Sequence, residues 1–225
     1  PQAKLAKELN YWTQKPYKVF FANSGAEANE AAIKLSRRFG KGRYEIITFL
    51  DSFHGRTLAA LSATGQKKYQ EGFEPLVQGF TSVPFNDINA VKAAITDKTA
   101  AIMLELVQGE GGINIAIPEF VKGVRELCDK HKLLLIVDEV QTGIGRRGTM
   151  FAWQQFGIEP DVFTLAKSLG GGLPIGMMLA KKEISDLLSP GTHASTFGGG
   201  PVVCRAALAV LRAVQKEKLL KHAKD

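Results

Sequence analysis

Lys167 and Asp138 are the two residues whose types and positions point most directly to chemistry. Asp138 lies in LLLIVDEV (133–140), a continuous apolar run that is typical of a parallel strand covered on both faces. A carboxylate there needs a cation, a metal or several hydrogen-bond donors, because an unpaired buried charge is strongly unfavourable. Lys167 ends a second apolar run, and glycines follow it at 170–172, where a bulky group could approach the backbone. The pair predicts a cofactor held between an amine and a carboxylate, and pyridoxal 5′-phosphate needs both groups.

The segment ANSGAEANEAA (22–32) is typical of a strand end followed by a helix. Ser24 and Glu27 have the spacing of a capping box, and the small residues Gly25 and Ala26 leave backbone N–H groups free at the helix N-terminus. Such a terminus attracts phosphate through these N–H groups and the helix dipole. An ordinary capped helix explains the same pattern equally well, so both interpretations stay open on these residues alone.

The loop FHGRT (53–57) combines an aromatic ring, an imidazole and a guanidinium after a predicted strand. Phe53 could stack on a planar cofactor, and Arg56 could bind a substrate carboxylate through paired hydrogen bonds. A core phenylalanine and a surface arginine are the simpler interpretation of this loop taken by itself. The loop is better interpreted as part of a site only if other motifs lie at the same end of the predicted sheet.

Two acidic residues, Glu105 and Glu110, flank a glycine-bearing turn in LELVQGEGGI (104–113). The three-glycine spacing of a dinucleotide site is absent, and paired acids in sequence do not establish the opposed carboxylates of a glycosidase. The G-x-x-x-x-G-K-[ST] motif of an ATPase is absent too. The histidines and the two cysteines show no zinc-binding spacing, so we predict no metal site.

Strand-like runs alternate with helical patterns along the whole chain, which predicts an α/β fold: three layers, α/β/α, around a mainly parallel central sheet. In such a sheet, functional groups collect at the carboxyl ends of the strands. The expected helices lie near 26–39, 118–131 and 201–220. The expected strands are KVFFA (18–22), YEIITF (44–49), AAIMLEL (100–106), LLLIVDEV (133–140), DVFTLA (161–166) and GMMLAK (176–181).

The composition of the 225 residues, 45% hydrophobic and 23% charged, is that of a globular domain. No apolar stretch approaches the ~20 residues of a membrane span, the first residues lack a signal peptide's apolar segment, and two cysteines make a disulfide framework improbable. A cytoplasmic protein without membrane contact is expected. The net charge of +7 is dispersed and not interleaved with aromatic residues, which argues against nucleic-acid binding.

Taken together, ANSGAEANEAA, FHGRTLAALSATGQ, VQGEGG, IVDEVQTGIGR, TLAKSLGGGLPIG and HASTFGGGP resemble the class III, fold-type I pyridoxal-phosphate aminotransferases over nearly the whole chain. Within that family the chain is most similar to members that act on acetylornithine, with those for ornithine and 4-aminobutyrate as neighbours. The resemblance implies transfer of an amino group from an ω-amino donor to 2-oxoglutarate, a 2-oxo acid.

The resemblance also assigns roles to single residues. Lys167 would form the internal aldimine and move the substrate proton, and Asp138 would keep the pyridine nitrogen protonated. Arg56 would bind a substrate carboxylate, and Glu110 would pair with a gating arginine. Thr196 would complete the phosphate site from the other subunit, so that a homodimer is expected. The cofactor-binding residues implied in this way are Ser24, Gly25, Ala26, Phe53, His54, Asp138, Val140, Gln141, Lys167 and Thr196.

The chain departs from the family pattern at Leu106, where proline is usual, and at Gly200, where asparagine is usual. We interpret residues 1–225 as one cofactor-binding large domain without the family's N-terminal segment and C-terminal small domain. Because the gating arginine belongs to the small domain, two alternatives stay open. The chain could bind the cofactor with little or no turnover, or it could be a structural fragment that binds no cofactor.

Overall fold

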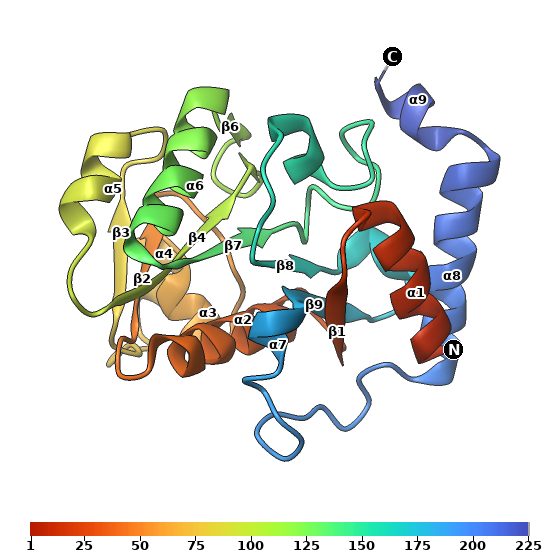
Figure 1. Ribbon diagram of the computed structural model, residues 1–225, viewed down its shortest axis with the longest axis horizontal. Helices are drawn as coiled ribbons and strands as arrows, with labels where there is room; N and C mark the ends of the chain where they lie inside the picture. The colour runs from red at the N-terminus through yellow and green to blue at the C-terminus, as the bar shows by residue number, and fades with distance from the viewer. Residues whose placement is uncertain (225) are drawn as a thin grey trace.

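The apolar runs of the sequence form a seven-stranded sheet between two layers of helices in the computed structural model, which describes residues 1–224 (Figure 1). All neighbouring strands are parallel except β9, which is antiparallel to both of its neighbours. The predicted three-layer, mainly parallel α/β architecture is therefore confirmed. In sheet order the strands are β1 (Tyr17–Ala22), β9 (Gly176–Lys181), β8 (Val162–Leu165), β7 (Leu134–Asp138), β4 (Thr99–Glu105), β2 (Glu45–Phe49) and β3 (Phe80–Val83).

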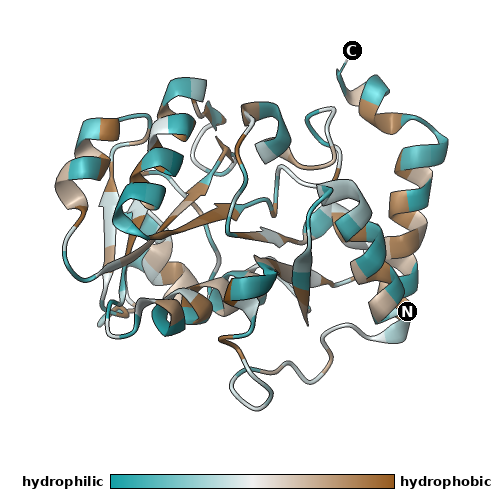
Figure 2. Ribbon diagram, viewed as in Figure 1, coloured by the Kyte–Doolittle hydropathy of each residue, from teal (hydrophilic) through white to brown (hydrophobic). Residues whose placement is uncertain are grey.

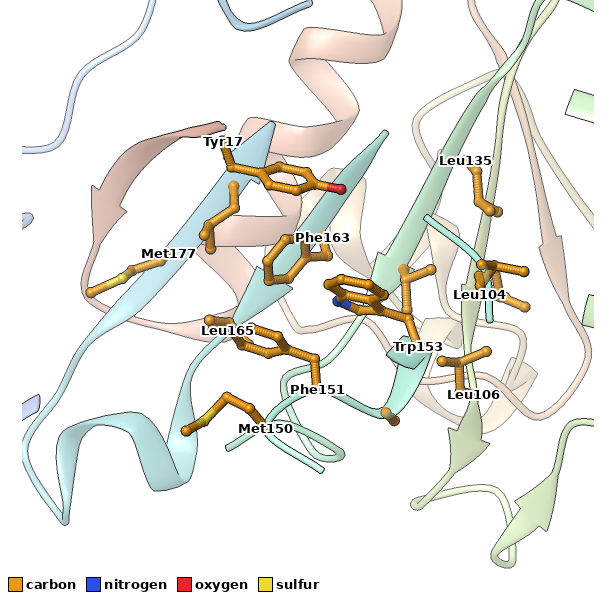
Figure 3. Packing of buried hydrophobic residues seen from close by; sticks show 14 of the residues in the cluster. Tyr17, Leu104, Leu106, Leu135, Met150, Phe151, Trp153, Phe163, Leu165 and Met177 are labelled. Atoms are coloured by element: carbon orange, nitrogen blue, oxygen red, sulfur yellow. The ribbon is translucent and has the colours of Figure 1, made fainter. Parts of the chain in front are cut away.

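Both faces of the central strands are buried, which explains why their sequences are continuously apolar. Along β7, Leu135 and Val137 belong to one hydrophobic cluster, whereas Leu134 and Ile136 belong to the other. Figure 2 shows the brown strands between helices whose outer surfaces are teal. The first cluster also contains the aromatic group of Figure 3, in which Phe151, Trp153 and Phe163 pack beside Tyr17.

The three predicted helices are present, and each starts at a residue suited to a helix N-terminus. Ser24 caps α2 (Gly25–Gly40), and prolines occupy the first turns of α6 (Pro118–His131) and α8 (Pro201–Lys216). The predicted helix 201–220 is divided, because α8 ends at Lys216 and α9 follows. The remaining helices are α1 (Gln2–Thr13), α3 (Leu58–Ala63), α4 (Lys67–Gln70), α5 (Ile88–Ala94), α7 (Lys182–Ser185), α9 (Leu219–Lys224) and the 3₁₀ helices η1 (Ala152–Phe156) and η2 (Lys167–Gly170).

α2 and α6 cover opposite faces of the sheet (Figure 1). α8 packs against α1 and η2 beyond the edge formed by β1, and a short hairpin of β5 (Val107–Gln108) and β6 (Asn114–Ile115) follows β4. No helix within residues 1–224 is long and apolar enough to cross a membrane. This arrangement leaves the side of the sheet at the carboxyl ends of its parallel strands open for a site.

Candidate active site

A pocket of about 580 Å³ lies at the carboxyl ends of the parallel strands. β9 runs the other way, so its beginning lies at this same edge and brings Pro174 and Ile175 to the pocket. Motifs that are distant in sequence therefore meet on one surface. Of the predicted site residues, those that line this pocket are Ser24, Gly25, Ala26, Phe53, His54, Arg56, Asp138, Val140, Gln141 and Lys167.

Asp138 ends β7 with its side chain almost fully buried and held by several donors. Its Oδ2 atom accepts hydrogen bonds from His54 Nδ1 and Asn29 Nδ2, both at 2.8 Å, and its Oδ1 atom accepts from the Val140 N–H at 3.0 Å. A carboxylate offers about four acceptor positions. Because Asp138 also lines the pocket, the remaining position suits a donor there, such as the protonated ring nitrogen of pyridoxal phosphate.

His54 and Glu105 surround Asp138 with further titratable groups. Burial alone lowers the pKa of His54, but the hydrogen bond that His54 donates to Asp138 and the charges of Asp138 and Glu105 outweigh burial and raise this pKa. Burial raises the pKa of Glu105 to about 7, against the opposing attraction of His54. The Glu105 carboxylate accepts a hydrogen bond from the Phe53 N–H at 2.9 Å, so it also holds the loop that carries Phe53.

The N-terminus of α2 forms the wall of the pocket expected to bind phosphate. The Ser24 hydroxyl accepts a hydrogen bond from the Glu27 N–H at 3.2 Å, as a capping box requires. The Glu27 carboxylate accepts from the Ser24 hydroxyl at 3.1 Å and from the Asn23 N–H at 2.9 Å, where a capping box would use the N-cap N–H. A Cβ atom at Gly25 would lie 2.8 Å from Val140 Cγ1, so only glycine fits between α2 and Val140. The small residues therefore keep the backbone N–H groups at the pocket surface.

Lys167 lies two positions after the end of β8 and begins η2 in a left-handed backbone conformation, with φ of 44°. This conformation is uncommon for a residue with a side chain and is often found at functional sites. The neighbouring Ser168 hydroxyl donates to the Gly143 carbonyl at 2.9 Å and ties this turn to the loop after β7. The backbone at the amine is thus held by the same loop that carries Val140 and Gln141.

Phe53 and Arg56 share one aromatic cluster. The Arg56 guanidinium lies 4.4 Å from the centre of the Tyr69 ring and 5.5 Å from that of Phe53. The two rings meet edge to face, with centroids 5.5 Å apart. These contacts hold the long Arg56 side chain at the pocket without an acidic partner among residues 1–224, which leaves the cation able to bind an anion.

Two predicted residues lie outside the lining of this pocket. Glu110 is exposed and its carboxylate accepts a hydrogen bond from Gln141 Nε2 at 3.2 Å, so it reaches the pocket through Gln141. Thr196 lines a neighbouring cavity of about 510 Å³, to which Asn23 and Pro174 also belong. The segment that carries Thr196 is held at the end of β1, where the Asn23 side chain donates to the Ser195 hydroxyl at 3.0 Å and a Cβ atom at Gly198 would lie 2.2 Å from the Phe21 carbonyl oxygen.

Sequence reasoning missed Asn29, Glu105 and Thr164 as parts of this site. Glu105 and Thr164 are the register partners of Asp138 on the two adjacent parallel strands, β4 and β8. Their positions at strand ends could have indicated this, since side chains in register at one sheet edge lie on the same face. Asn29 stands within the predicted motif 22–32, one helical turn after the cap.

Comparisons with known proteins agree over most of the chain. Residues 1–225 match the family model described as aminotransferase class-III. The acetylornithine aminotransferase of Caldanaerobacter subterraneus is 58% identical over 208 residues, which cover 90% of this chain and 53% of that protein. The acetylornithine aminotransferase of Methanocaldococcus jannaschii is 55% identical over 229 residues, which cover 100% of this chain and 57% of that protein.

Solved structures give the same result for the fold. The ornithine aminotransferase of Toxoplasma gondii superimposes with a TM-score of 0.93 at 34% identity, over 98% of this chain and 54% of that one. An amine transaminase from an uncultivated Pseudomonas species, solved in its PLP-bound form, gives a TM-score of 0.92 at 29% identity, over 98% of this chain and 58% of that one. The chain thus spans about half the length of the relatives it matches.

Proposed function

Because the chain belongs to the class-III aminotransferase family, we propose that it transfers an amino group from an ω-amino donor of the acetylornithine or ornithine type to 2-oxoglutarate. The observation that carries this proposal is that one pocket contains both an amine, Lys167, and a buried carboxylate with an open acceptor position, Asp138. Class-III aminotransferases depend on pyridoxal 5′-phosphate, which when bound withdraws electrons from the carbon atom that carries the amino group.

The pocket offers a suitable group for each part of this cofactor. The backbone N–H groups of Ser24, Gly25 and Ala26 lie at the N-terminus of α2, where a helix stabilises phosphate. We assign the ring nitrogen to Asp138, whose charge would hold a proton there. Phe53 and Val140 would cover the two ring faces. Gln141 and His54 also line the cofactor pocket, and we assign the phenolic oxygen to Gln141.

Lys167 is the residue to which we assign both covalent attachment of the cofactor, through Nζ, and proton transfer. An amine is a suitable proton carrier here, because it can accept a proton from the substrate carbon and return it to a neighbouring position without leaving the site. The backbone next to Lys167 is held to the loop after β7 by the hydrogen bond from Ser168 to Gly143. The lysine side chain therefore extends from a backbone position that is fixed relative to Asp138. This positioning contributes to the rate by holding the reacting groups in place.

Arg56 is the group to which we assign a carboxylate of the donor or of the 2-oxo acid. Its guanidinium packs on Tyr69 and Phe53 and has fork geometry suited to a carboxylate. Glu110 lies beyond Gln141 and would attract a cation, either of the donor or of a gating arginine elsewhere in a longer protein.

We further propose that the working form is a homodimer in which Thr196 serves the phosphate site of the partner subunit. The position of Thr196 in the neighbouring cavity, outside the pocket of its own chain, is what an exchanged residue requires. Phe197 is 79% exposed beside it, which is unusual for a phenylalanine and favours a covered position in an assembly.

Titration with pyridoxal 5′-phosphate tests the proposal. We expect a visible absorption band that is lost in Lys167→Ala and retained in Lys130→Ala, which removes an exposed lysine of α6. Adding N-acetylornithine should then deplete the band, and 2-oxoglutarate should restore it. A band without depletion would indicate a cofactor-binding domain with little turnover. A chain with no Lys167-dependent band would contradict the proposed function and leave a cofactor-free fragment.

A further inference from the structure

Asn29 is a buried polar residue whose side chain joins four separate parts of the site. It lies on α2, one turn after Ser24, and is 1% exposed. Its Nδ2 atom donates to Asp138 Oδ2 at 2.8 Å, on β7, and to the His54 carbonyl at 2.7 Å, in the loop after β2. Its Oδ1 atom accepts from the Thr164 hydroxyl at 2.8 Å, on β8.

These partners require an amide in one orientation. Both N–H bonds of the Asn29 amide point to acceptors, a carboxylate and a carbonyl, while its oxygen faces a hydroxyl donor. Rotating the amide by 180° would place its oxygen against the His54 carbonyl oxygen and Asp138 Oδ2. An aspartate at position 29 would add a second negative charge beside Asp138. A leucine would leave three buried polar groups with one partner fewer each, which is unfavourable.

The same contacts determine how the Asp138 carboxylate is turned. Its Oδ2 atom receives two N–H groups, those of His54 and Asn29, and its Oδ1 atom receives the Val140 N–H. The Thr164 hydroxyl lies 3.5 Å from Oδ1 but only 2.8 Å from the Asn29 oxygen, so its hydrogen goes to the amide. Without the Asn29 donor, Oδ2 would have a second free acceptor position, and the carboxylate would no longer be held in one orientation.

We infer that Asn29 is a positioning residue, whose amide orients the Asp138 carboxylate so that its free acceptor position faces the ring nitrogen of the bound cofactor. This inference rests on the proposed function. Asn29 lines the pocket, but its amide N–H groups and oxygen are bonded to Asp138, His54 and Thr164, so in this role it acts through Asp138. The same amide holds the His54 carbonyl, so it also sets the distance between α2, where phosphate is expected, and the loop that carries Phe53.

The test compares two ligands that differ at the ring nitrogen alone. Dissociation constants are measured for pyridoxal 5′-phosphate and for its 1-deaza analogue, which has a C–H group in place of that nitrogen. The wild-type protein should prefer the nitrogen-containing ligand by about ten- to hundredfold, the range of a hydrogen bond to a charged group. Asn29→Ala should lower this preference by about fivefold or more, and Thr164→Val, which frees the amide oxygen, should lower it less.

Two controls separate positioning from stability. Ser36→Ala removes another buried polar group of α2, whose hydroxyl donates to the Ile33 carbonyl at 2.7 Å, and should leave the ligand preference unchanged. In an Asp138→Asn background, Asn29→Ala should have no further effect on the preference, because the two residues act together. An equal weakening of both ligands in Asn29→Ala, or a wild-type protein with no preference, would overturn the inference. If the wild-type protein shows no binding of pyridoxal 5′-phosphate that depends on Lys167, the result would instead reject the proposed function.

A measurement on the cofactor-free protein covers the case in which a variant binds neither ligand. Histidine labelled with ¹⁵N reports the His54 Nδ1–H group that donates to Asp138 Oδ2, the atom shared with Asn29. We expect this resonance to shift in Asn29→Ala and to stay in place in Ser36→Ala. An unchanged resonance in folded Asn29→Ala would show that the carboxylate keeps its orientation without the amide.

Discussion

Glu105 and Asp138 are register partners at the carboxyl ends of adjacent parallel strands, β4 and β7, so two buried carboxyl groups face the same pocket. They are held differently. Asp138 has three close donors, whereas burial dominates at Glu105 and raises its pKa to about 7. Burial, together with the neighbouring Asp138 carboxylate, thus favours the protonated form of Glu105.

We expect Glu105→Gln to change how stability depends on pH. The pKa of Glu105 is about 7 in the folded chain and near 4.5 in the unfolded one, so the folded state binds this proton more tightly. Its contribution to stability is complete below pH 4.5 and is lost as the pH rises through 7. Urea unfolding should show the wild type losing about 3 kcal/mol relative to Glu105→Gln over this interval. The exposed substitution Glu126→Gln is the control, and parallel pH curves for wild type and Glu105→Gln would contradict the prediction.

A second prediction concerns the approach of two backbones at Gly176. A Cβ atom there would lie 2.0 Å from the Ser24 carbonyl oxygen, so Gly176→Ala must displace either β9 or the N-terminus of α2. We expect a loss of about 3 kcal/mol in the free energy of unfolding, together with weaker binding of pyridoxal 5′-phosphate. Gly200→Ala is the control, because its nearest neighbour would be 3.6 Å away. If Gly176→Ala and Gly200→Ala unfold at the same urea concentration, β9 and the N-terminus of α2 can move apart at little cost, and the prediction is wrong.

The cap of α2 gives a third prediction. Ser24→Ala and Asp87→Ala each remove an N-cap side chain, from α2 and α5, and each should lower stability by about 1 kcal/mol. Only the α2 cap lies at the pocket. Ser24→Ala should therefore also reduce the preference for pyridoxal 5′-phosphate over pyridoxal, by a few fold, as measured by fluorescence titration. The same reduction in Asp87→Ala would show that the effect is not local.

Glu139 carries the fourth prediction, because it is fully buried and holds the loop after β7. Its carboxylate accepts hydrogen bonds from the Thr142 hydroxyl at 2.7 Å, the Ala152 N–H at 3.0 Å and the Trp153 N–H at 2.8 Å. An amide at this position offers one oxygen to three donors, so Glu139→Gln should destabilise the fold by about 2 kcal/mol. Thermal unfolding against the exposed control Glu119→Gln measures this, and coincident transitions would refute it.

The sequence predicted α6 to the residue, because Pro118 and the apolar periodicity mark both ends of the helix. Strand runs were also located, although LLLIVDEV ends as a strand at Asp138 rather than Val140. The direction of β9 could not be predicted, since an apolar run buried on both faces reads alike in either direction. The short hairpin β5–β6 has too few residues for a period to be visible.

For the site, sequence reasoning found residues that stand in conspicuous motifs and missed those defined by register. Glu105 and Thr164 belong with Asp138 only because β4 and β8 flank β7, which is a property of strand order. Asn29 resembles any polar residue on a helix until its partners on β7 and β8 are known. The position of Thr196 depends on the path of the loop before α8, and the hydrophobic periodicity of a sequence does not predict the path of a loop.

The pairing of the first and last strands of the sheet has a consequence for synthesis on the ribosome. β1 lies at the sheet edge and pairs only with β9, and 154 residues separate the partners Ala22 and Gly176. At about 5–20 residues per second, β1 waits roughly ten seconds or more for that partner. During this interval the turn at Ser24 has no strand to support it. Factors that protect an emerging chain would therefore meet β1 as an unpaired, largely apolar segment and release it only once β9 has emerged.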